Sequence, residues 1–140
     1  MTPFMLGSFS VAPDGTLVPP LGNSAAVRFS WRGRVCRAEI TQGRLALAIQ
    51  AGRVPSTAEP GADRARALAT VKALPRRMPK GLRLKLAPDH SIRIESKEIV
   101  DHPPSAVFLV AAMVRFALET DPYLDALEAG GSGRAKTWPG

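Results

Sequence analysis

The segment Val27–Ile49, VRFSWRGRVCRAEITQGRLALAI, decides the fold, because apolar and polar side chains alternate along most of its length. The alternation is interrupted at Gly33 and again at Gln42-Gly43. Glycine at such positions is typical of turns between antiparallel strands. The segment therefore predicts three consecutive strands of an antiparallel meander.

A period of two assigns the two kinds of side chain in this segment to opposite faces of the sheet. One face is apolar and carries Val27, Phe29, Trp31, Cys36, Ala38, Ile40, Leu45, Leu47 and Ile49. The other face is polar and carries Arg28, Ser30, Arg32, Arg37 and Glu39. Such a division is typical of an antiparallel sheet that is covered on one side only.

Further strands are expected on both sides of the meander. Phe4–Val11 predicts one strand, and Leu17-Val18 begins another after the turn residues Pro13 to Gly15. Downstream, Leu82–Leu86 and Ile92–Glu95 alternate in the same way and predict a second hairpin.

Two main helices are expected. The first covers Ala62–Leu74, with a capping box at Ser56–Glu59 and Pro75 as its end. The second runs from Pro103 or Pro104 to about Glu119. Asp121-Pro122 resembles a cap followed by a first-turn proline, so a separate short helix is expected over Tyr123–Glu128.

The predicted fold class is α+β: a twisted antiparallel sheet of five or six strands in the order β-meander, helix, β-hairpin, helix, with two helices packed on one face. Residues 1–130 are expected to form a single domain and residues 131–140 a flexible basic C-terminal tail. The order of elements is similar to that of the small dimeric chaperones of type III secretion, although their initial helix is missing here and they are typically acidic. No residue role is carried over from that family.

The 140-residue chain has a net charge of +7, which is unevenly distributed. Residues 1–56 carry +4, residues 57–100 carry +5 and residues 101–140 carry −2. A single cysteine excludes an internal disulfide and favours a reducing compartment, so a cytoplasmic location is expected. We expect neither a signal peptide nor a membrane span, because the longest apolar run, Ser105–Leu118, is too short to cross a bilayer.

Candidate catalytic residues are few. Asp89-His90-Ser91 contains the residue types of a hydrolase triad, but adjacent residues do not converge on one proton, and a turn explains them better. His102 is interpreted as part of a helix start and Cys36 as a small core residue. We therefore expect no enzyme, no metal and no cofactor. The alternative, a site assembled in space from His90, His102 and Cys36, stays open.

One predicted binding face consists of basic side chains on the polar side of the sheet: Arg28, Arg32, Arg37, Arg83, Lys85 and Arg93, with Arg44 as a further candidate. If the two hairpins join one sheet, these cations converge and can neutralise phosphates. Phe29 and Trp31 would lie on the opposite face, so no aromatic platform for base stacking is expected there.

A second predicted surface is the apolar helix around Ala106–Leu118, with Val107, Val110, Met113 and Val114 as candidate dimer contacts. A helix that is apolar on all sides must be buried on more than one side. The first functional hypothesis is a non-enzymatic protein-binding module, chaperone-like or regulatory, that acts as a homodimer with an unidentified protein partner. The alternative is nucleic-acid or polyanion binding through the basic face.

Overall fold

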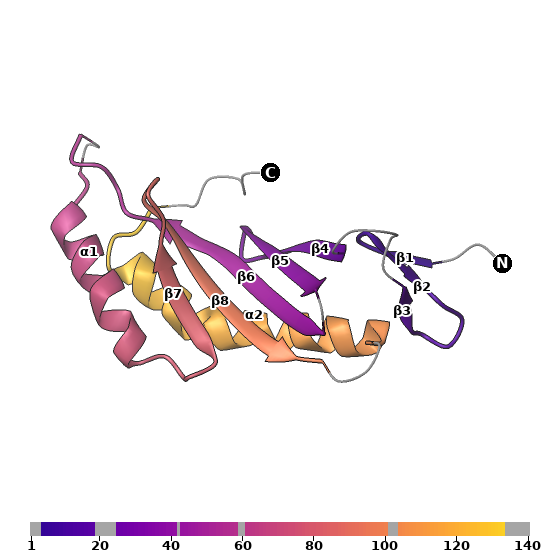
Figure 1. Cartoon of the computed structure of the whole chain (residues 1–140). Coiled ribbons are helices and arrows are strands. Elements are labelled where there is room, and N and C mark those ends of the chain that lie inside the picture. The colour runs from indigo at the N-terminus through magenta and orange to yellow at the C-terminus, as the bar shows by residue number, and fades with distance from the viewer. Residues whose placement is uncertain (1–3, 19–24, 42, 59–60, 101–103, 134–140) are drawn as a thin grey trace.

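The computed structural model describes residues 4–18, 25–41, 43–58, 61–100 and 104–133. Its main feature is a five-stranded antiparallel sheet in the order β4-β5-β6-β8-β7 (Figure 1). The strands are β4 (Ala25–Trp31), β5 (Arg34–Thr41), β6 (Arg44–Arg53), β7 (Leu82–Leu86) and β8 (Ser91–Ile99). The α+β class with antiparallel strands is confirmed. The long strand β6 lies in the centre and joins the meander to the second hairpin.

The N-terminal strands do not belong to this sheet. β1 (Phe4–Leu6), β2 (Phe9–Val11) and β3 (Leu17–Val18) form a separate three-stranded sheet at the end of the molecule remote from α1 (Figure 1). The prediction of one strand over Phe4–Val11 was wrong, because Gly7 has a φ of +60° and makes a turn within it. A Cβ on Gly7 would lie 2.7 Å from the carbonyl oxygen of Ala26, so a side chain has no room there.

Helix α1 (Arg64–Ala73) begins later than the sequence pattern suggested. The Asp63 carboxylate accepts a hydrogen bond of 3.0 Å from the backbone N–H of Arg66, so Asp63 is the cap in place of the expected Ser56–Glu59 box. Glu59 lies outside the described residues. A single 3₁₀ turn over Leu74–Arg76 contains Pro75, where the helix was expected to end.

Helix α2 (Ala106–Ala129) is a single helix of 24 residues, capped by Ser105. The separate helix expected after Asp121-Pro122 was wrong, because α2 continues through Pro122. Thr120, Leu124 and Leu127 are fully buried around the proline, so the core holds both halves of the helix in line. No helix in the described part of the chain is long and apolar enough to cross a membrane.

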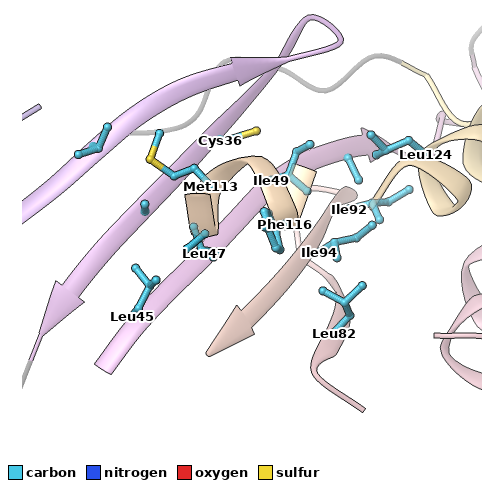
Figure 2. Packing of buried hydrophobic residues seen from close by; sticks show 14 of the residues in the cluster. Cys36, Leu45, Leu47, Ile49, Leu82, Ile92, Ile94, Met113, Phe116 and Leu124 are labelled. Atoms are coloured by element: carbon cyan, nitrogen blue, oxygen red, sulfur yellow. The ribbon is translucent and has the colours of Figure 1, made fainter. Parts of the chain in front are cut away.

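The core lies between the sheet and the helices, because the apolar face of the meander turns toward α2. Leu45, Leu47 and Ile49 of β6 point at the side of α2 that carries Met113 and Phe116 (Figure 2). Helix α1 adds the buried side chains Ala67 and Val71 and contacts α2. The other face of the sheet is left without a covering helix (Figure 1).

A proline inside a helix removes one hydrogen bond and crowds the preceding turn. Since Pro122 is exposed and α2 is continuous, we expect Pro122→Ala to raise the free energy of unfolding by about 1–2 kcal/mol. Urea denaturation followed by circular dichroism measures this. Pro79→Ala, at an exposed loop position, is the control and should not stabilise the chain. A loss of stability in Pro122→Ala would contradict the view that Pro122 destabilises α2.

Candidate functional site: a basic groove on the sheet

Strand pairing places polar side chains from all five strands on the uncovered face, which we call the outer sheet face. One row of paired residues crosses the whole sheet: Arg28, Arg37, Ala48, Glu95 and Arg83. A neighbouring row contains Glu39, Ala46 and Lys97. On the other side of the first row, Arg93 of β8 pairs with Lys85 of β7. The predicted convergence of the two hairpins in one sheet is therefore present.

The outer sheet face is hollowed. Two adjoining hollows of about 370 and 330 Å³ share Lys85, Glu95, Ser96 and Lys97 in their walls. We call them together the basic groove. Its charged residues are Arg37, Glu39, Arg44, Lys80, Arg83, Lys85, Arg93, Glu95 and Lys97. Seven cations therefore face two carboxylates.

The hollow shape follows from the sequence of β6. Two of its outward residues are Ala46 and Ala48, and their short side chains form the floor of the groove. The strands on either side place long side chains next to them, Arg37 and Glu39 on β5 and Glu95 and Lys97 on β8. Large residues beside small ones leave a trough over the central strand.

Both carboxylates of the groove are already paired. Glu39 Oε2 lies 3.2 Å from Arg37 Nη2. The two oxygens of Glu95 lie 3.1 Å from Lys85 Nζ and 3.3 Å from Arg93 Nη1. Among the described residues, no carboxylate pairs with Arg44, Lys80, Arg83 or Lys97. The groove therefore keeps a strong positive potential.

Five of the six predicted basic residues lie on the outer sheet face, namely Arg28, Arg37, Arg83, Lys85 and Arg93. Four of them line the groove, and Arg28 lies beside it, paired with Arg37 across β4 and β5. Arg44 also lines the groove. Sequence reasoning missed Lys97 because the second hairpin was ended at Glu95, although the alternation Arg93, Glu95, Lys97 continues.

Arg32 was assigned to the wrong face. It occupies the turn after β4 with a φ of +51°, and its guanidinium binds the helix instead of the groove. Arg32 Nη2 lies 2.7 Å from the Asp125 carboxylate, and this hydrogen bond raises the pKa of Arg32. Asp121 accepts a hydrogen bond of 2.7 Å from Trp31 Nε1, and Glu128 lies 2.6 Å from Arg34 Nη2. These acids fasten the β4–β5 turn to α2.

The aromatic residues of β4 lie away from the groove, as predicted. Phe29 and Trp31 are half-buried and pack against the core. No aromatic side chain is among the residues that line the two hollows. The groove therefore offers cations and small side chains, and no platform on which a base could stack.

Two of the three residues of the alternative catalytic site, Cys36 and His90, lie in the described part of the chain and on different elements. Cys36 lies in the middle of β5 and is fully buried, and burial raises the pKa of its thiol to about 12. His90 is exposed in the β7–β8 turn with a φ of +70°. Next to it, Asp89 accepts hydrogen bonds from the hydroxyl and the N–H of Ser91, which lower the pKa of Asp89. His102 lies outside the described residues.

No group of histidine, cysteine and carboxylate side chains in the described ranges could hold a metal ion.

The four candidate dimer residues of α2 lie on two different sides of the helix. Val107, Val110 and Val114 are exposed, whereas Met113 is 9% exposed and belongs to the core. Met113 is therefore not available for a dimer contact, because its position on the helix faces the sheet.

The buried thiol gives a direct chemical prediction. With a pKa of about 12 in place of 9.0, the thiolate fraction of Cys36 at pH 8 falls roughly a thousandfold. We expect the native chain to react with a thiol reagent at least about a thousandfold more slowly than the urea-unfolded chain. Absorbance of released thionitrobenzoate measures both rates. Comparable rates in the two states would show that Cys36 is an accessible, reactive thiol.

Comparisons with protein-family models, with curated proteins and with solved structures return no significant match for this chain. The similarity to type III secretion chaperones therefore depends on the order of elements alone. The chemistry of the basic groove is the basis for the function proposed below.

Proposed function

We propose that this protein binds the phosphodiester backbone of nucleic acids in the basic groove, without base specificity. The observation that carries the proposal is the concentration of seven cations around two adjoining hollows, with both local carboxylates already paired. Lysine and arginine that neutralise phosphates release counterions, and this release drives non-specific nucleic-acid affinity.

The distribution of the cations favours a polymer over a small anion. Arg37 lies on β5, whereas Arg83 and Lys85 lie on β7, three strand spacings away, or about 14 Å. Lys80 and Arg44 extend the charge into the second hollow. A chain with regularly spaced phosphates can contact all of these cations at once, whereas a single phosphate contacts one group of them.

The absence of base readout follows from the same lining residues. Sequence-tolerant single-strand binders usually add aromatic side chains on which bases stack. Here the floor of the groove consists of Ala46 and Ala48, and the aromatics of β4 point to the other side. Contact with the phosphodiester backbone therefore supplies most of the binding free energy, and the affinity should depend steeply on salt concentration.

The protein-binding role suggested first by the sequence depends on a different surface, the exposed side of α2. The groove is the stronger basis for a function because it combines a concave shape with a defined chemistry. An acidic protein is a competing ligand for the same cations, and the experiment below separates it from nucleic acid.

The first prediction concerns charge removal in the groove. Four cations of the groove have no paired carboxylate among the described residues. We therefore expect a plot of log Kd against log salt concentration to have a slope of about 3 for a fluorescent dT30 oligonucleotide. Arg83→Ala combined with Lys97→Ala should reduce this slope by about 1.4, since each contact with a single strand contributes about 0.7, and should weaken binding at least tenfold at 50 mM salt. Fluorescence anisotropy at several salt concentrations measures both quantities.

The matched control is Arg115→Ala combined with Lys72→Ala, which removes the same charge from the helix side of the molecule. This variant should keep the salt slope of the wild type. Equal losses in the two double variants would mean that only net charge matters and would refute the groove. Tighter binding of poly-glutamate than of dT30 would replace nucleic acid by an acidic protein as the ligand.

A second prediction concerns Glu95, the carboxylate in the shared wall of the two hollows. It pairs with Lys85 and Arg93, so these cations are partly neutralised before a phosphate arrives. Glu95→Gln removes this competition, and we expect about three- to tenfold tighter binding of dT30 with a steeper salt slope. Glu98→Gln is the control, because Glu98 also lies on β8 and is ion-paired, but to Arg115 of α2 at 3.3 Å. A gain in Glu98→Gln equal to that in Glu95→Gln would contradict the assignment.

A further inference from the structure

The outward side of α2 carries an apolar stripe that the protein itself does not cover. It consists of Val107, Val110, Ala111, Val114 and Leu118, and the four large members are 43–78% exposed. Their spacing repeats every three or four residues, which places them in one line along the helix. Val107 alone is 78% exposed, more than any other large apolar residue among those described.

The stripe has the properties of a helix-packing surface. No charged residue occurs from Ala106 to Val114, and the line of side chains is regular enough to interlock with a second helix. Arg115 borders the stripe, but it is held by Glu98 of β8 at 3.3 Å. It therefore brings no unpaired cation to a partner that covers the stripe.

We propose that a second copy of this chain covers the stripe, with the two α2 helices antiparallel about a twofold axis near residues 112–113. In this arrangement Val107 of one copy meets Leu118 of the other, and Ala111 meets Val114. The two Arg115 side chains are then offset by about 7 Å along the helix axis, since each residue rises about 1.5 Å. An isologous contact requires this kind of self-complementary patch.

The area fits a dimer of modest affinity. The largest apolar patch on a typical monomer covers about 300–600 Å², and at that size two copies of the stripe would bury about 600–1,200 Å² of apolar surface. Specific interfaces bury about 1,200–2,000 Å² in total, of which slightly more than half is apolar. The stripe therefore supplies the apolar share of an interface at the lower end of this range, with a Kd on the order of micromolar.

For contact between two copies, charge favours this face over the groove. The groove side is strongly cationic, so two copies that met through it would repel each other. Helix α2 instead carries one arginine against Glu119, Asp121, Asp125 and Glu128. Because no charged residue occurs from Ala106 to Val114, two copies that meet through this part of α2 bring no like charges together.

The dimer has a consequence for the groove, and this point depends on the function proposed above. Because α2 and the groove lie on opposite faces of one sheet, the dimer presents two grooves on its two outer sides (Figure 1). One dimer can then hold two segments of a polyanion, which raises the affinity for long ligands relative to short ones.

Sedimentation velocity of the full chain from 1 to 200 μM, without nucleic acid, tests the proposal. We expect a concentration-dependent shift from monomer to dimer in the wild type. Val107→Glu and Val114→Glu should each weaken the dimer at least tenfold, because the symmetry places two carboxylates in the interface. Ile99→Glu is the matched control: Ile99 is 76% exposed but lies at the end of β8 beside Arg44, and this variant should dimerise like the wild type.

Three outcomes would overturn the proposal. The first is a wild type that stays monomeric at 200 μM. The second is a dimer that both stripe variants retain, which would place the interface elsewhere. The third is binding of the monomer to phosphatidylcholine vesicles that Val107→Glu abolishes, which would make a lipid surface the partner. Unchanged circular dichroism spectra confirm that the variants fold, and Arg83→Ala should dimerise normally whether or not nucleic acid binds the groove.

Discussion

The packing of α2 against β6 is the contact on which the rest of the molecule depends. Leu45, Leu47 and Ile49 are at most 3% exposed, and they meet the side of α2 that carries Met113 and Phe116 (Figure 2). Because side chains alternate along a strand, burial of these three residues forces Ala46 and Ala48 to the other face. The same contact thus creates the core and the floor of the basic groove, and no local change can move one without the other.

Strand positions and faces were predictable wherever the alternation was strict. The faces of β4, β5, β7 and β8 follow from a period of two, and five of the six basic residues lie on the outer sheet face for this reason. Arg32 does not, because it lies in a turn, where the alternation no longer determines direction. Its position depends on Asp121 and Asp125, about ninety residues away in the sequence, and local patterns contain no information about such pairs.

A further error has the same origin. Asp121-Pro122 has the local appearance of a helix start, but Asp121 is occupied by Trp31 and Arg32, and the burial of Thr120 and Leu124 keeps the helix continuous. Tertiary packing outweighs the local cost of the proline. The groove itself was only partly predictable, since its two hollows depend on the pairing of β6 with β8, a contact between segments that the sequence separates by α1 and β7.

The separation of charge between the two faces links these features into one arrangement. The acids of α2 are used to hold Arg32 and Arg34, so they neutralise arginines that would otherwise add to the surface on the helix side. In the lining of the basic groove, Glu39 and Glu95 face seven cations. This chain with a net charge of +7 thus carries one cluster of cations over the trough, whereas no charged residue occurs from Ala106 to Val114 in the stripe of α2. The phosphate ligand and the second copy proposed above use opposite faces, so neither would displace the other.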